Sequence, residues 1–279
     1  MKEDLITIGR RSLAYTEFGL PDGDCLFFFH GAPMSRLQLV PLEKQFAAEG
    51  LRVLAPERPG YGLSSPQTGR SMADWAIDVA TLADHLGIGR FAVAGHSSGG
   101  PYAVACAALL PNRVTAALVL SGVTNMAWPG AWVGYPEAEV KLMRMSDEYA
   151  TIAACVELYG ADGSIFLNEP FDLPDPDGEV LADPAFEQAM REAFRQGVGG
   201  YAQDLYLQGR PWPFDPGGIT IPVDLVHGDQ DQLLPIAHSC HTAELIPGAS
   251  FRTIPGHGHL SILAELPWLA GALVRSAGT

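Results

Sequence analysis

Short apolar runs alternate with longer amphipathic stretches along much of the chain. The run at residues 25–29 stops at His30-Gly31, as a strand buried on both faces of a sheet does. Four further runs have the same character, at residues 51–55, 91–94, 114–120 and 223–226. Between them, residues 37–49, 72–86 and 101–110 carry apolar side chains at helical spacing. Strands that alternate with helices predict an α/β fold with a mostly parallel, doubly wound sheet.

Two parts of the chain depart from this alternation. Before it, residues 5–7 and 12–18 have strand character and are joined by a turn, which predicts an antiparallel edge to the sheet. Later, the alternation stops after Ser121-Gly122 and resumes only at residues 219–222. We therefore predict a core domain made of residues 1–123 and 216–279, with residues 124–215 inserted into it as a helical cap, or lid.

The predicted cap is rich in large, adaptable apolar side chains. It holds 13 of the 25 aromatic residues and 4 of the 7 methionines, and it has helical stretches at 137–158 and 184–207. This composition suits a lid over an apolar pocket, and it would equally serve a core of the cap's own. Residues 169–187 carry seven acids and no base, which predicts a solvated, mobile loop. The acids do not have the register of a calcium loop, because Leu173 and Pro184 would stand at its first and last ligand positions.

Charge narrows the classes of partner. Lys plus Arg number 17 against 32 for Asp plus Glu, a formal charge of −15, and nucleic acid or an anionic membrane surface would need a concentrated basic face. No apolar run reaches the length of a membrane span and the start lacks a secretion signal, so we expect a soluble, cytoplasmic protein. Its four cysteines form no C-x-x-C pair and are expected to be small buried hydrophobes: Cys25, Cys106, Cys155 and Cys240.

The most specific string is Gly95-His96-Ser97-Ser98-Gly99-Gly100, between a predicted strand and a predicted helix. In this context G-x-S-x-G is typical of a nucleophile elbow, in which the glycines relieve crowding around a serine held in a strained turn. The start of the helix also offers backbone N–H groups and a positive dipole end to a developing oxyanion. A phosphate-binding loop is disfavoured, since the lysine of that motif is missing and the glycine spacing does not fit.

A serine nucleophile needs a base to take its proton and an acid to orient that base. Residues 227–235 follow one predicted strand and supply Asp229 and Asp231, and residues 255–259 follow a strand at 250–254 and supply His257 and His259. The order serine, acid, histidine is the one that accompanies a nucleophile elbow. The spacing leaves the choice within each pair open. The two alternate imidazoles lack further spaced ligands, so we expect no metal and no cofactor.

Nearly the whole chain resembles the α/β-hydrolase superfamily. His30-Gly31-Ala32-Pro33 is similar to its HGxP oxyanion loop, residues 58–64 resemble its RPGYGxS segment, and residues 95–99 match its elbow. The resemblance implies that fold, with an eight-stranded sheet and a helical cap. It selects Asp231 from a G-x-x-D acid loop and His259 from a GH pair before the last helix, and it implies that the N–H groups of Ala32 and Ser98 hold the oxyanion. Glu57 stands where aspartate is usual, in a segment that is structural in most members.

The resemblance implies a serine hydrolase whose small-molecule substrate is a neutral, fairly apolar carboxylic ester or lactone. Ser97 would be the nucleophile, His259 the base and Asp231 the orienting acid. An amidase or iminopeptidase, a C–C bond hydrolase or a perhydrolase could use the same three residues, and a receptor for a small apolar molecule could share the fold. Dehalogenases and epoxide hydrolases of this fold are disfavoured because they use an aspartate nucleophile. Substrate contacts are expected from the motifs and the cap, at His96, Met34, Ser35, Trp128, Trp132 and Trp212.

Overall fold

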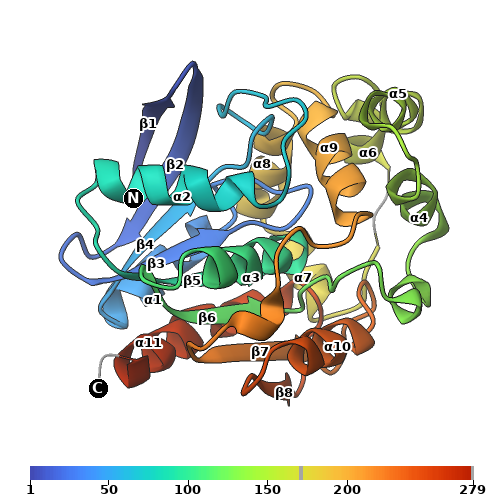
Figure 1. Ribbon diagram of the computed structural model, residues 1–279. Coiled ribbons are helices and arrows are strands. Elements are labelled where there is room, and N and C mark those ends of the chain that lie inside the picture. The colour runs from blue at the N-terminus through green and yellow to red at the C-terminus, as the bar shows by residue number, and fades with distance from the viewer. Residues whose placement is uncertain (170–171, 278–279) are drawn as a thin grey trace.

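A computed structural model describes residues 1–169 and 172–277 and contains an eight-stranded sheet (Figure 1). Residues 170–171, in the predicted cap, and 278–279, at the end of the predicted core, lie outside the described residues. The strand order is β1-β2-β4-β3-β5-β6-β7-β8; β2 pairs antiparallel with both β1 and β4, and all other pairs are parallel. The predicted α/β class and antiparallel edge are confirmed. The strands are β1 (Lys2–Ile8), β2 (Arg11–Gly19), β3 (Asp24–Phe29), β4 (Leu51–Pro56), β5 (Phe91–His96), β6 (Val114–Leu120), β7 (Val223–Gly228) and β8 (Ser250–Ile254).

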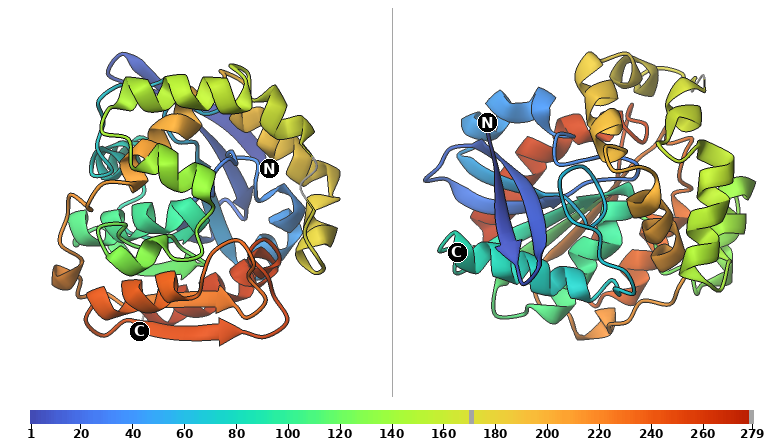
Figure 2. Two further views of the ribbon diagram at one scale, coloured as in Figure 1. Left: turned by 90° about the vertical axis from the view of Figure 1, so that its right-hand side faces the viewer. Right: turned by 90° about the horizontal axis from the view of Figure 1, so that it is seen from above.

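Helices cover both faces of this sheet (Figures 1 and 2). On one face pack α1 (Glu43–Ala48) and α11 (Leu266–Ala277), and on the other pack α2 (Asp74–His85), α3 (Gly100–Leu109) and α10 (Ala237–Leu245). The helix expected over residues 37–49 is α-helical only in its second half, after a 3-10 turn that contains Pro41. The short 3-10 helices are Val40–Leu42, Ser97–Gly99, Pro129–Trp132, Pro216–Gly218 and Ser261–Glu265.

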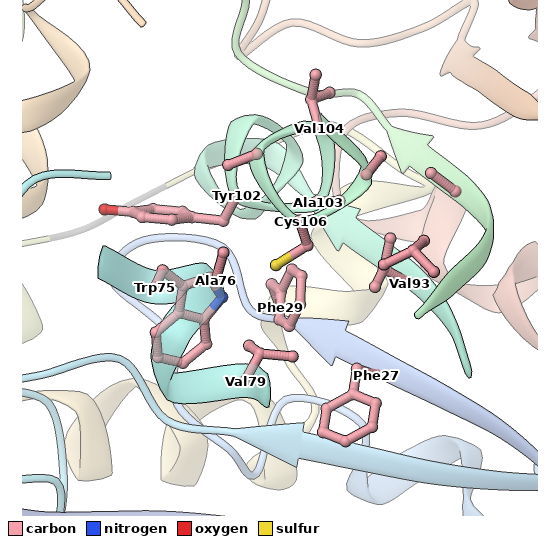
Figure 3. Close-up of a cluster of buried hydrophobic side chains, with 14 of the residues drawn as sticks. Phe27, Phe29, Trp75, Ala76, Val79, Val93, Tyr102, Ala103, Val104 and Cys106 are labelled. Atoms are coloured by element: carbon pink, nitrogen blue, oxygen red, sulfur yellow. The ribbon is translucent and has the colours of Figure 1, made fainter. Parts of the chain in front are cut away.

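The larger hydrophobic cluster fills the space between the sheet and α2 and α3 (Figure 3). Phe29 on β3 meets the ring of Trp75 on α2 edge-on, with the ring centroids 5.5 Å apart. Tyr102 and Cys106 on α3 are fully buried in the same cluster. Because both faces of the central strands are buried, the loops at their carboxyl ends start from a rigid platform.

Among the described residues, six α-helices lie between β6 and β7 and gather beside the sheet, from the upper middle to the right of Figure 1. The two long helical stretches expected here are each broken. The Asp147 carboxylate caps a new helix by accepting from the N–H of Ala150, and Gly197, at φ +89°, separates the other pair. The boundaries 124 and 215 of the cap remain a prediction. The helices are α4 (Glu137–Met143), α5 (Glu148–Tyr159), α6 (Ser164–Asn168), α7 (Asp177–Leu181), α8 (Pro184–Ala193) and α9 (Gly199–Gln208).

One apolar stretch among the described residues, Glu148–Asn168, has the length and hydropathy of a membrane span. It comprises α5, of 12 residues, and α6, of 5 residues. At about 1.5 Å per residue, α5 alone reaches roughly 18 Å, short of the roughly 30 Å apolar layer of a bilayer. The stretch is therefore weak evidence for a membrane segment.

Candidate active site

Ser97 stands at the turn between β5 and α3, near the middle of the sheet. Its backbone has φ +54°, a left-handed conformation that costs energy for any residue other than glycine. A Cβ on Gly95 would collide with the carbonyl oxygen of Gly99, and a Cβ on Gly99 would collide with that of Phe29. The two glycines of the motif are therefore required by the close approach of backbone, and the turn has the strained form expected of a nucleophile elbow.

Ser97 lines a cavity of about 220 Å³ between the carboxyl ends of the strands and the helices of the predicted cap. His259, in the loop after β8, lines the same cavity. The surrounding residues are mostly apolar, and none of the described lining residues is Lys or Arg. The core contributes residues 31–34, 96–98, 233–234 and 259–260, and the helical segment contributes Tyr135, Pro136, Glu139, Phe166, Leu167, Glu169, Leu181, Phe186, Met190, Tyr201, Leu205 and Gln208.

Asp231 forms a hydrogen bond with His259, with 2.7 Å between Oδ2 and Nδ1. The other carboxylate oxygen of Asp231 accepts from the N–H groups of Leu233 and Leu234, at 2.9 and 2.8 Å. The ring of His227 lies 3.1 Å from Oδ2. Burial alone would raise the pKa of Asp231, but the nearby His259, the hydrogen bonds from both histidines and the Leu234 N–H hold the pKa well below its usual range. Asp231 is therefore a carboxylate that can orient an imidazole and stabilise its positive form.

The other members of the two ambiguous pairs lie elsewhere. Asp229 is exposed and its carboxylate accepts from the N–H of Gly256. The ring of His257 lies 3.2 Å from the carbonyl oxygen of Ser261 and 3.4 Å from the carboxylate of Glu265. The acid and histidine that the fold brings together are thus Asp231 and His259.

A chain of hydrogen bonds joins residues 30–33, the proposed oxyanion loop, to the elbow and to the histidine loop, residues 255–261 after β8, which carry His259. The N–H of Gly31 donates to Gln38 Oε1 at 2.9 Å, Gln38 Nε2 lies 3.1 Å from His96 Nδ1, and His96 Nε2 lies 2.8 Å from the carbonyl oxygen of His259. Burial and the neighbouring His259 lower the pKa of His96 to about 3. A neutral His96 can donate from Nε2 and accept at Nδ1, so it bridges the two loops. Ala32 and Ser98 both line the cavity beside Ser97.

Asp204 on α9 anchors the helical segment to the core through a buried charge cluster. Its carboxylate is fully buried and accepts from Arg58 Nε and Arg70 Nη2, both at 2.7 Å, and from the hydroxyls of Tyr61 and Tyr102. Burial alone would raise the pKa of Asp204, but the two guanidinium groups and the hydrogen bonds lower it to about 2. Arg58 also donates to the carbonyl oxygens of residues 30 and 31. The cluster therefore connects the cap side of the cavity to the oxyanion loop.

Asp177, at the start of α7, makes a second connection, to the histidine loop. Its carboxylate accepts from the N–H groups of His259, Leu260 and Ser261, at 2.7, 3.0 and 2.9 Å, and from the Ser261 hydroxyl at 2.8 Å. A Cβ on Gly258 would collide with this carboxylate, so the glycine before His259 is required here.

The expectation of a solvated loop over residues 169–187 is therefore wrong in part: residues 177–181 form α7, residues 184–187 begin α8, and Asp177 is 4% exposed. Asp172, Asp175 and Glu179 are exposed as expected, and residues 170–171 lie outside the described residues. The four donors that bury Asp177 come from a loop more than 80 residues later in the chain, so local composition held no sign of them.

Two of the six predicted substrate contacts, Met34 and His96, line the cavity. Ser35 does not contribute to the described lining, since it is fully buried and its hydroxyl accepts from the N–H of Leu37. Trp212 is also outside the described lining, since it packs into the larger core cluster and stacks on Phe214, with the ring centroids 5.2 Å apart.

Trp128 and Trp132 also find partners away from the described cavity lining. Trp128 stacks on His241 with the ring centroids 4.2 Å apart, and the guanidinium of Arg144 lies 4.5 Å from the ring centre of Trp132. The composition of the segment indicated aromatic walls, but it held no information on the direction of each ring.

The cap-side lining that sequence reasoning missed follows helical spacing. Tyr201, Leu205 and Gln208 lie on one face of α9, at i, i+4 and i+7, and Glu139 lies on α4, while Tyr135 precedes that helix. That spacing was visible in the sequence. The sequence did not indicate that this face of α9 would meet a cavity rather than another helix.

The chain belongs to the α/β-hydrolase family, whose model matches residues 26–272. It is 29% identical over 266 residues to a non-heme chloroperoxidase of Streptomyces lividans, covering 91% of this chain and 92% of that relative. It is 26% identical over 266 residues to a bifunctional esterase/perhydrolase of Acinetobacter calcoaceticus, covering 88% of each. The solved structure of a thermophilic esterase from Thermogutta terrifontis, 21% identical, matches with a TM-score of 0.72 over 100% of both chains.

Proposed function

We propose that this protein is a serine hydrolase that cleaves a neutral, fairly apolar carboxylic ester or lactone through an acyl-enzyme on Ser97. One observation carries the proposal: the hydrogen-bonded pair of Asp231 and His259 lies at the same cavity as a serine in a strained strand-to-helix turn. This is the arrangement of acid, base and nucleophile that acyl transfer requires.

In this mechanism the Ser97 hydroxyl attacks the carbonyl carbon while His259 Nε2 takes its proton. The N–H groups of Ala32 and Ser98 stabilise the resulting oxyanion, and Asp231 stabilises the imidazolium of His259. The tetrahedral intermediate collapses, the alkoxide leaves with the proton from His259, and the acyl group stays on Ser97. Water then attacks the acyl-enzyme with His259 again as base, which releases the carboxylic acid and restores the serine.

The character of the cavity supports an uncharged, largely apolar substrate. Met34, Leu205 and Phe186 are among its apolar walls, and a substrate anion would meet no cation among the described lining residues. The formal charge of −15 also disfavours polyanions at long range. The helices between β6 and β7 would act as the lid that encloses the acyl or alcohol group.

Covalent labelling tests this proposal. A fluorescent alkyl phosphonate should label the purified protein stoichiometrically, and Ser97→Ala should abolish labelling and lower kcat on phenyl butyrate by about six orders of magnitude. Labelling that survives in Ser97→Ala would overturn the assignment. A panel of phenyl esters graded by acyl length would then define the apolar pocket.

A perhydrolase is the second candidate, and the chloroperoxidase and esterase/perhydrolase relatives favour it. In that reaction hydrogen peroxide replaces water in attack on the acyl-enzyme, and a peracid leaves in place of the acid. Adding hydrogen peroxide and monochlorodimedone with bromide to the ester assay would detect the peracid through halogenation. Halogenation that depends on both Ser97 and the ester would establish this activity.

A further inference from the structure

One carboxyl and one amide of the cap segment that are not exposed line the cavity and have no part in the proposed chemistry, whereas the other lining carboxyl of the segment, Glu169, is exposed. Glu139 lies on α4 and Gln208 at the end of α9, among walls that are otherwise largely apolar. A polar group in such a place is costly unless it is hydrogen-bonded, so each needs a partner.

Glu139 has a single protein hydrogen bond in the part of the chain that the structure describes, from the hydroxyl of Tyr201 at 3.2 Å. No ion pair involves this carboxyl among those described residues, and Tyr201 satisfies only one of the acceptor sites on its two oxygens. Burial raises the pKa of Glu139, and the Tyr201 hydrogen bond only partly opposes that rise. The carboxyl therefore has free capacity to accept a hydrogen bond from a molecule in the cavity.

Gln208, in contrast, has a hydrogen-bond donor that lacks an acceptor within the described part of the chain. Its side chain is 2% exposed, and Nε2 is a buried donor without a hydrogen-bond partner among the described residues. An unpaired buried amide is destabilising. Since Gln208 lines the cavity, a cavity-bound acceptor would satisfy it.

The two residues lie on helices that are in contact with each other. Met143 of α4 packs against Gly209, so closely that a Cβ on Gly209 would collide with the Met143 carbonyl. Glu139 lies one helical turn before Met143, and Gln208 directly precedes Gly209. Both residues therefore line one cavity from two closely packed helices.

We propose that Glu139 and Gln208 form a specificity site for a hydroxyl group that the substrate carries in addition to its reacting ester group. A hydroxyl both donates and accepts, so it can donate to the Glu139 carboxyl and accept from Gln208 Nε2. A methyl group would satisfy neither, and an ammonium would leave the Gln208 donor unpaired. This rests on the proposed function and narrows the neutral ester to a hydroxy-ester.

Three phenyl esters of matched size test the site: phenyl 6-hydroxyhexanoate, phenyl heptanoate and phenyl 6-aminohexanoate. The wild type should favour the hydroxy-ester over the heptanoate in kcat/KM by about tenfold or more, because a site built to hydrogen-bond a hydroxyl rejects its apolar analogue. Glu139→Gln and Gln208→Leu should each lower the ratio of kcat/KM for the hydroxy-ester to kcat/KM for the heptanoate by about tenfold, which brings a tenfold ratio to near one. A ratio between two esters on one variant cancels general losses of activity.

Glu137→Gln is the matched control, since Glu137 is on the same helix but exposed, and it should leave the ratio unchanged. Dissociation constants of the three esters on Ser97→Ala protein give the same ratios without turnover. Equal binding of hydroxy-ester and heptanoate, or preference for the ammonium ester, would overturn the hydroxyl site while leaving the hydrolase proposal intact. Conversely, a hydroxyl preference in binding without Ser97-dependent turnover would overturn the hydrolase proposal alone.

Discussion

The two walls of the cavity are built in different ways. The core wall consists of loops at the carboxyl ends of strands, where tight backbone contacts place Ser97 and a hydrogen bond to Asp231 orients His259. The cap wall consists of helix faces, where Glu139, Tyr201 and Gln208 are placed by packing between helices. The core wall can therefore be read from short motifs, because glycine and reactive residues stand at set spacings. The cap wall depends on contacts that no short motif encodes.

Asp231→Asn tests the core wall and should have the largest effect. An amide in place of the carboxylate would favour the wrong tautomer of His259, so kcat should fall by about four orders of magnitude. The measurement is steady-state turnover of a phenyl ester. Asp229→Asn removes the neighbouring exposed acid and should change kcat little. Equal losses in the two variants would break the assignment of Asp231.

Asp204→Asn tests the connection between the two walls. The change leaves Arg58 and Arg70 buried with a neutral partner, so the free energy of unfolding should fall by about 3–5 kcal/mol, as when a buried ion pair is broken. Urea unfolding of both proteins at neutral pH measures the difference.

The same residue predicts a pH dependence of stability. The folded pKa of Asp204, about 2, lies below the ordinary value of 3.8, so its stabilising contribution is present above about pH 4 and is lost as the pH falls towards 2. The gap in thermal midpoint between wild type and Asp204→Asn should therefore narrow from pH 4 to pH 2. A constant gap across that window would contradict an ionised Asp204.

Asp177→Asn tests whether the cap side positions His259, the proposed catalytic base. An amide can no longer accept from all four donors of the histidine loop, and a small displacement of His259 should lower kcat by about 10- to 100-fold. KM should change much less, since Asp177 is not among the described residues that line the cavity. Glu179→Gln, at an exposed site on the same helix, is the control. A lower melting temperature with unchanged kcat would assign Asp177 a purely structural role.

Aromatic substitutions within the cap should have the smallest effects on kinetics. They distinguish rings that line the cavity from rings that do not. Trp132→Ala removes a ring that packs on Arg144, and kcat/KM should stay within about twofold. Phe166→Ala removes a ring that lines the cavity, and KM for long-chain esters should rise several-fold as apolar contact is lost. An equal response to the two changes would show that the rings lining the cavity have no special part in substrate binding.

The sequence by itself determined the α/β class, the antiparallel edge and the position of the strained elbow, because these follow from local period and from glycines at set spacings. Residue spacing brought the choice of acid and histidine down to two neighbours each, and the resemblance to the family then selected Asp231 and His259. Only the tertiary structure paired Asp231 with His259, buried Asp177 against the histidine loop and turned Trp212 into the core. It alone also directed Glu139 and Gln208 to one cavity. The physical reason is distance along the chain: each of these contacts joins residues tens of positions apart, and their partners are set by how helices pack rather than by local pattern.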